Sequence, residues 1–129
     1  MIESLVLKNF KSFKELKIDF SNLNLLTGVN GVGKSTVIQA LLLVRQSFLK
    51  NVFPQKGIML NGDLISLGKG SDVLNIHSEV PEISLCFNMS GGDKIDIALK
   101  FVGDSDFLPI IKSRSKVFSS ALKSVLFTN

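Results

Sequence analysis

The first twenty residues of the chain have a pattern of hydrophobic and polar positions that predicts two strands. Ile2–Lys8 is apolar at its centre, which is typical of a strand buried on both faces. Residues 16–20 place a hydrophobic side chain at every second position, the period of a half-buried strand. The stretch between them, Asn9–Lys14, is polar except for two phenylalanines. We therefore expect a hairpin or tight bend there, with Phe10 and Phe13 packed inward as hydrophobic side chains.

Hydrophobic and polar residues alternate again on both sides of Ser90–Asp93. Two alternating runs joined by a short glycine-containing turn predict an antiparallel hairpin over 81–103. Near the end of the chain the hydrophobic residues change to helical spacing, and we expect a basic C-terminal helix over 107–129. Glycines and prolines interrupt the connection over 51–80, which we expect to be irregular.

A glycine-rich segment lies between a short apolar run and a long one. Leu23–Thr27 predicts a third strand, and residues 35–50, which hold no Gly or Pro and are apolar nearly all round, predict a buried helix. The segment between them fits the phosphate-binding pattern G-x-x-x-x-G-K-[ST], which requires a strand before the loop and a helix after it. Its residues are Gly28, Val29, Asn30, Gly31, Val32, Gly33, Lys34, Ser35 and Thr36.

Each residue type in this loop has a chemical reason. Glycines at Gly28, Gly31 and Gly33 let backbone N–H groups approach a chain of phosphates, where side chains would block them. Lys34 can reach the β and γ phosphates, and the hydroxyl of Ser35 can ligate Mg²⁺. The N-terminus of the next helix adds partial positive charge and unpaired N–H groups. The sequence therefore predicts a site for a nucleoside triphosphate with magnesium.

Composition narrows the class of protein further. With 129 residues, 45% of them hydrophobic, the chain can bury one modest core. A single cysteine, Cys86, excludes an internal disulfide, and the chain shows neither a secretory leader nor a long uncharged apolar run, so we expect a cytoplasmic protein that does not enter a membrane. The net charge is +4, and the excess of positive residues lies after residue 107. These residues form either a basic surface that contacts nucleic acid or an ordinary solvated face. That surface comprises Lys112, Arg114, Lys116 and Lys123.

Two segments, Ile2–Phe13 and Leu25–Thr36, together resemble the N-terminal part of ABC-type ATPase heads of the SMC, RecF and OLD-like branch. Those heads carry a similar Asn-Phe-Lys-Ser-Phe corner and a Gly-x-Asn-Gly-x-Gly-Lys-Ser loop. Further along, Ala40–Ser47 and Leu60–Gly68 look like a bacterial group of AAA ATPases in the same branch. The resemblance covers about the first 75 residues.

The resemblance implies an α/β fold, namely a partial P-loop NTPase domain of the ABC-ATPase-like head type. Such a head combines an antiparallel β-lobe with the strand and helix of the phosphate loop. It holds ATP and Mg²⁺, two heads close on two nucleotides, and by position Lys11–Lys14 would lie near the nucleotide. A full-length protein of this kind would hydrolyse ATP as a homodimer of heads in DNA repair, chromosome maintenance or phage defence. DNA and a nuclease partner or domain are its candidate partners.

The motifs for hydrolysis are missing from this stretch of sequence. In this branch an Asp-Glu pair follows an apolar strand, and no acid here follows four consecutive apolar residues. Ser90–Gly92 resembles a signature loop, but a strand pattern follows it, so we expect a turn. Gln39 and Gln46 indicate a polar stripe on the helix rather than a glutamine that senses Mg²⁺. We therefore name no catalytic residue, and expect this chain to bind nucleotide and to hydrolyse it weakly at most.

Two other classes of protein remain open from the sequence. A self-contained small P-loop phosphotransferase would bind its substrate in the connection over 51–80, but it needs a lid with arginines, and Arg45 and Arg114 are the arginines of the chain. A non-hydrolytic interaction or DNA-binding domain would use the basic helix over 107–129. His77 has no Cys or His near it, so we expect a surface residue rather than a zinc ligand.

Overall fold

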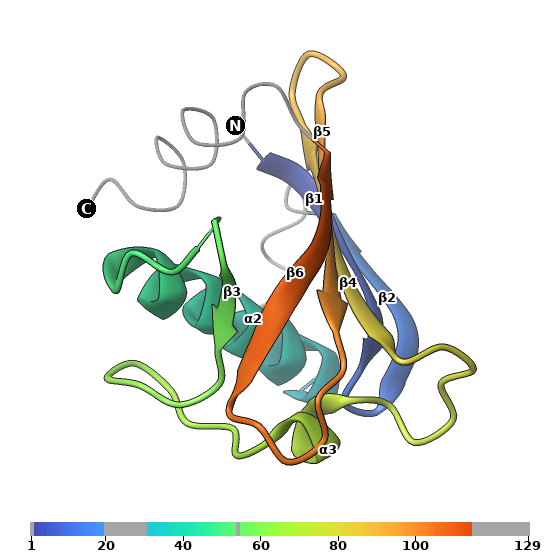
Figure 1. Cartoon of the computed structure of the whole chain (residues 1–129). Helices are drawn as coiled ribbons and strands as arrows, with labels where there is room; N and C mark the ends of the chain where they lie inside the picture. Colours follow the sequence, from blue (N-terminus) through green and yellow to red (C-terminus); the bar gives the residue numbers. More distant parts are fainter. Residues whose placement is uncertain (1, 20–30, 54, 115–129) are drawn as a thin grey trace.

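An antiparallel sheet with a long helix across one face makes up the described part of the chain (Figure 1). The structure is a computed structural model and describes residues 2–19, 31–53 and 55–114. Its helices and strands, in chain order, are β1 (Ile2–Phe10), β2 (Phe13–Asp19), α2 (Gly31–Leu49), β3 (Gly57–Met59), α3 (Gly70–Val73), β4 (Glu82–Met89), β5 (Lys94–Lys100) and β6 (Phe107–Arg114).

The six strands lie in the order β2-β1-β4-β5-β6-β3, and every neighbouring pair is antiparallel. The pair β1 and β4 joins segments far apart in the sequence, with Leu5 opposite Phe87 and Leu7 opposite Leu85. Residues that face each other across a pair of strands point to the same side of the sheet. These four side chains, all buried, therefore form part of one apolar face, and α2 packs against it.

Both predicted hairpins are confirmed. β1 pairs with β2 up to Phe10 opposite Phe13, and β4 pairs with β5 along their whole length. In the turn between β4 and β5, Gly91 and Gly92 both have φ of +90°, a left-handed conformation that glycine adopts without strain. Phe10 is buried in the core as expected, and Phe13 is half-buried. The turn expected at Ser90–Gly92 is confirmed as well.

The prediction of a basic helix over 107–129 is wrong for its first part, because residues 107–114 form strand β6. This strand pairs with β5 on one side and with β3 on the other, and it buries Leu108 in the core. The hydrogen-bonding edge of β5 needs a partner, which favours an extended segment here. The helical spacing that suggested a helix begins at Val117, and residues 115–129 lie outside the described residues, as does the strand expected at 23–27.

Helix α2 begins at Gly31, four residues before the expected start, so it includes two thirds of the glycine-rich pattern. Its buried stripe recurs at helical spacing through Val37, Ala40 and Val44, and this stripe covers the sheet. The expectation of a helix buried all round is wrong on the opposite side, where Ile38 is 45% exposed. A helix packed against a single sheet face has one covered side, whatever its sequence on the other.

The connection over 51–80 is irregular, as expected, but it packs tightly. It includes the short strand β3 and the single turn α3, and it buries Phe53, Leu60 and Val73 in the core. Gly70 opens α3 in close contact with β6 and the loop before it, where a Cβ atom would clash with the carbonyl oxygen of Val102. Within the described ranges, no helix has the length and apolar character needed to cross a membrane.

The core can be tested with two substitutions of one residue type. Ile83 is 1% exposed and Ile76 is 88% exposed. Ile83→Ala leaves a cavity in the core, so we expect the free energy of unfolding to fall by about 2–5 kcal/mol. Ile76→Ala removes a side chain that is already in water, so it should change the free energy of unfolding by less than about 0.5 kcal/mol. Urea denaturation measures both, and equal losses would contradict this assignment of the core.

Candidate functional site

The start of α2 carries the last two thirds of the glycine-rich pattern. Gly33 and Thr36 are buried, Lys34 is half-buried and Ser35 is exposed. The N–H groups of the first helical turn have no partner within the helix, and the helix dipole makes this end attractive to an anion. The described part of the predicted loop therefore places an accessible lysine and serine at a helix N-terminus. Gly28, Val29 and Asn30 lie outside the described residues.

The corner between β1 and β2 and the start of α2 lie toward the same end of the sheet in Figure 1. Phe10 anchors the corner, because its side chain lines one apolar cluster together with Ala40 and Leu43 of the helix. Lys11 is half-buried and Lys14 is exposed. The expectation that Lys11–Lys14 lie near the nucleotide stays a prediction.

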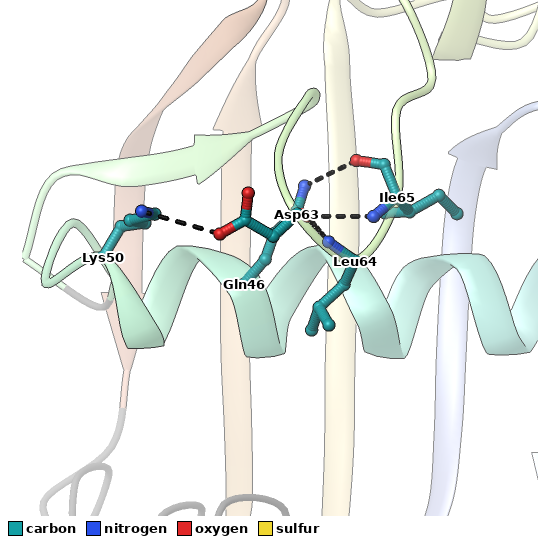
Figure 2. A network of polar contacts seen from close by, with 5 residues as sticks. All are labelled: Gln46, Lys50, Asp63, Leu64 and Ile65. Atoms are coloured by element: carbon teal, nitrogen blue, oxygen red, sulfur yellow. Dashed lines mark hydrogen bonds and ion pairs between the residues drawn. The ribbon is translucent and has the colours of Figure 1, made fainter.

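The far end of α2 holds a polar residue whose role the sequence pattern did not indicate. Gln46 is 3% exposed and lies under the loop that follows β3 (Figure 2). Its Oε1 accepts hydrogen bonds from the N–H groups of Leu64 and Ile65, at 3.1 Å each. Its Nε2 donates to the carbonyl oxygens of Met59, at 3.0 Å, and of Ile65, at 3.1 Å.

These four hydrogen bonds use the whole capacity of the Gln46 amide, two donors and two lone pairs of the oxygen. Gln46 therefore has no group left to bind Mg²⁺ or a water, and its role is to hold the loop. The sequence analysis expected Gln46 in a polar stripe of the helix, and the structure buries this residue. Helical spacing could have found it, since it lies three residues after Leu43, on the buried side of the helix.

Two neighbours strengthen the attachment of this loop to α2. Ser47 is fully buried, and its hydroxyl donates to the carbonyl of Leu43 at 2.7 Å while it accepts from the N–H of Met59 at 2.8 Å. Lys50 forms an ion pair with Asp63 at 3.7 Å between exposed side chains, which adds little to stability. The end of α2 is thus fixed mainly by buried hydrogen bonds.

Acidic and metal-binding side chains do not gather in the described ranges. No group of three or more His, Cys, Asp or Glu residues is placed there to hold a metal ion. His77 is exposed on a loop, as expected.

Cys86 lies on the face of the sheet opposite α2, across the strand pair from Asp96. Burial raises the pKa of its thiol, and the negative charge of Asp96 and a hydrogen bond to that carboxylate raise it further. Lys94 and Lys8 act in the opposite direction with smaller effect. The thiol is therefore a poor nucleophile at neutral pH.

Comparison with known proteins places the chain in a family. Residues 1–127 match the AAA ATPase domain, and the chain belongs to this family. It is 33% identical over 110 residues to an ATP/GTP phosphatase of Helicobacter pylori. The matched stretch covers 82% of this chain and 30% of that protein. Membership of an ATPase family implies nucleotide binding.

The names of two further relatives refer to DNA repair and to chromosome partition. The chain is 30% identical over 106 residues to the DNA double-strand break repair Rad50 ATPase of Archaeoglobus fulgidus, covering 81% of this chain and 10% of that protein. It is also 30% identical over 122 residues to the chromosome partition protein Smc of Methanocaldococcus jannaschii, covering 89% of this chain and 10% of that one. The resemblance to the N-terminal part of SMC and RecF-like ATPases is confirmed. No solved structure gives a significant match.

The role of Gln46 can be tested against Gln39, a half-buried glutamine on the same helix. Gln46→Leu keeps the volume but leaves two N–H groups and two carbonyls of the attached loop without a side-chain partner. We expect a loss of about 2–4 kcal/mol in the free energy of unfolding. Gln39→Leu should change it by less than about 0.5 kcal/mol. Equal values in urea denaturation would contradict the attachment of the loop by Gln46.

The environment of Cys86 can be tested by alkylation. Because the thiolate reacts and the raised pKa keeps the thiol protonated, iodoacetamide should modify Cys86 at pH 8 more slowly than a cysteine in an unfolded peptide. Asp96→Asn removes the negative charge, so the midpoint of the rate against pH should move to lower pH. An unchanged midpoint would show that Asp96 does not act on the thiol.

Proposed function

We propose that the chain binds Mg·ATP through Gly28–Thr36, as the phosphate loop of a P-loop ATPase domain. The observation that carries the proposal is the start of α2 at Gly31, which puts the half-buried Lys34 and the exposed Ser35 on the first two turns of the helix. Membership of the AAA ATPase domain family supports the same ligand. Backbone N–H groups of the loop would hold the phosphates, Lys34 would neutralise the β and γ phosphates, and Ser35 would ligate Mg²⁺.

We further propose that the chain is the nucleotide-binding part of a larger ATPase. It spans 30% of the length of the Helicobacter pylori relative and 10% of that of Rad50 and Smc. The full protein would hydrolyse ATP as a pair of heads in DNA repair, chromosome maintenance or phage defence, with DNA and a nuclease as candidate partners. The similarity to Rad50 and Smc supports the DNA-related roles. The hydrolytic residues would come from sequence outside the described ranges.

The proposed site can be tested by calorimetry of ATP binding, with and without Mg²⁺. Lys34→Ala removes a charge-assisted contact to phosphate worth about 1.5–3 kcal/mol, so we expect the Kd to rise by about 10- to 150-fold. Lys50→Ala makes the same change in net charge beyond the other end of α2, and should leave the Kd within about twofold.

The two variants separate a specific contact from a general effect of charge. If Lys34→Ala binds ATP as tightly as the unaltered chain, the assigned role of the loop is wrong. If both variants weaken binding equally, the effect is long-range electrostatics rather than a contact made by Lys34.

A further inference from the structure

The corner between β1 and β2 has an unusual backbone. Asn9 and Lys11 have φ of 59° and 55°, in the left-handed region that residues other than glycine rarely occupy. Such conformations persist where surrounding contacts hold them, and they concentrate at functional sites. The contacts that hold these two residues in this conformation therefore bear on the function of the corner.

The segment after α3 holds the corner through backbone and side-chain hydrogen bonds. Asn75 is 3% exposed, and its N–H donates to the carbonyl of Asn9 at 3.0 Å. Its side-chain Nδ2 donates to the carbonyl of Lys11 at 2.8 Å, and the N–H of Lys11 donates to the carbonyl of Val73 at 2.6 Å. Both left-handed residues are thus tied to one short segment, with Asn75 bonded to each of them.

This segment is itself fixed on its other side. The N–H of Gly70 donates to the carbonyl of Ser105 at 2.8 Å, and the N–H of Ser71 to that of Gly103 at 3.0 Å. The Asn75 Oδ1 accepts from the N–H of His77 at 2.9 Å, which closes a local turn. Asn75 therefore connects the corner to a rigid support rather than to a freely moving loop.

The corner carries two lysines, Lys11 and Lys14. The ion pairs given by the described side chains are Lys8 with Glu15 and Lys50 with Asp63, and Lys11 belongs to neither. Phe10, next to Lys11, contacts the same cluster as Ala40, which lies six residues after Lys34, or about 9 Å along the helix axis. Lys11, a half-buried residue outside both of these ion pairs, is thus next in the chain to a residue that packs on the same helix as Lys34.

We propose that Asn75 is a positioning residue of the nucleotide site. It holds Lys11 in the left-handed conformation that directs the lysine ammonium toward the phosphates of ATP at the start of α2. Asn75 itself does not touch the nucleotide. This inference rests on the proposed function, since Lys11 needs a polyphosphate to bind.

The test measures ATP affinity by calorimetry in four variants. Asn75→Ala and Asn75→Asp both lose the donor to Lys11, although Asp keeps an acceptor for the N–H of His77. Lys11→Met removes the charge and keeps the length. Asn61→Ala is the control, because Asn61 also makes two side-chain hydrogen bonds to backbone, with Gly68, at 2.9 and 3.0 Å, on another loop.

We expect both Asn75 variants and Lys11→Met to raise the Kd for ATP by about three- to tenfold, and Asn61→Ala to leave it unchanged. In the double variant with Lys11→Met, Asn75→Ala should cause no further loss, because its effect passes through Lys11. A purely structural role would not produce this coupling. Thermal unfolding checks that each variant is folded at the temperature of the measurement.

Four outcomes would overturn the inference while Lys34→Ala still weakens binding. They are ATP affinity unchanged in the Asn75 variants, equal losses in Asn61→Ala, additive losses in the double variant, or unchanged affinity in Lys11→Met. If both Asn75 variants fail to fold, unchanged ATP affinity in Lys11→Met still overturns the inference. If the unaltered chain does not bind ATP, or Lys34→Ala binds it equally well, the proposed function itself fails and this inference falls with it.

Discussion

The contact between the apolar stripe of α2 and one face of the antiparallel sheet sets the position of every group discussed above. The stripe is buried against strands from both ends of the described chain, so the helix cannot shift without uncovering the core. Because Lys34 and Ser35 lie on the first two turns of this helix, their position follows from the packing of residues further along it. The proposed phosphate site is thus placed by hydrophobic burial and supplied with charge by the helix start.

Buried polar side chains then fix what hydrophobic packing leaves free. Gln46 attaches the loop after β3 to the far end of α2, and Asn75 attaches the β1–β2 corner to the segment after α3. Both side chains are nearly inaccessible, and both bind backbone groups rather than other side chains. Such contacts are directional, so they determine the conformation of loops that burial alone would leave variable. The far end of α2 and the β1–β2 corner are therefore each held to a defined segment.

Local patterns in the sequence predicted the parts of the fold that depend on neighbours along the chain. The period of two predicted both hairpins, and the apolar run after the glycine-rich pattern predicted the long helix, which begins four residues earlier than expected. Strand β6 was missed because its conformation depends on the edges of β5 and β3, which are distant in sequence. The roles of Gln46 and Asn75 were missed for a related reason, since their partners are backbone groups on other segments. Lys34 and Ser35 were proposed from their spacing, and the structure puts both near the start of α2.

The most direct test of the central claim is an NMR titration of backbone amide signals with Mg²⁺ and a non-hydrolysable ATP analogue. If the start of α2 holds the phosphates, the largest shifts should fall on the N–H groups of Gly31–Ser35, because these point at the ligand. The amides of the β4–β5 hairpin, far from the start of α2, should not move. Saturable shifts confined to other parts of the sheet, or no shift at millimolar nucleotide, would contradict the claim.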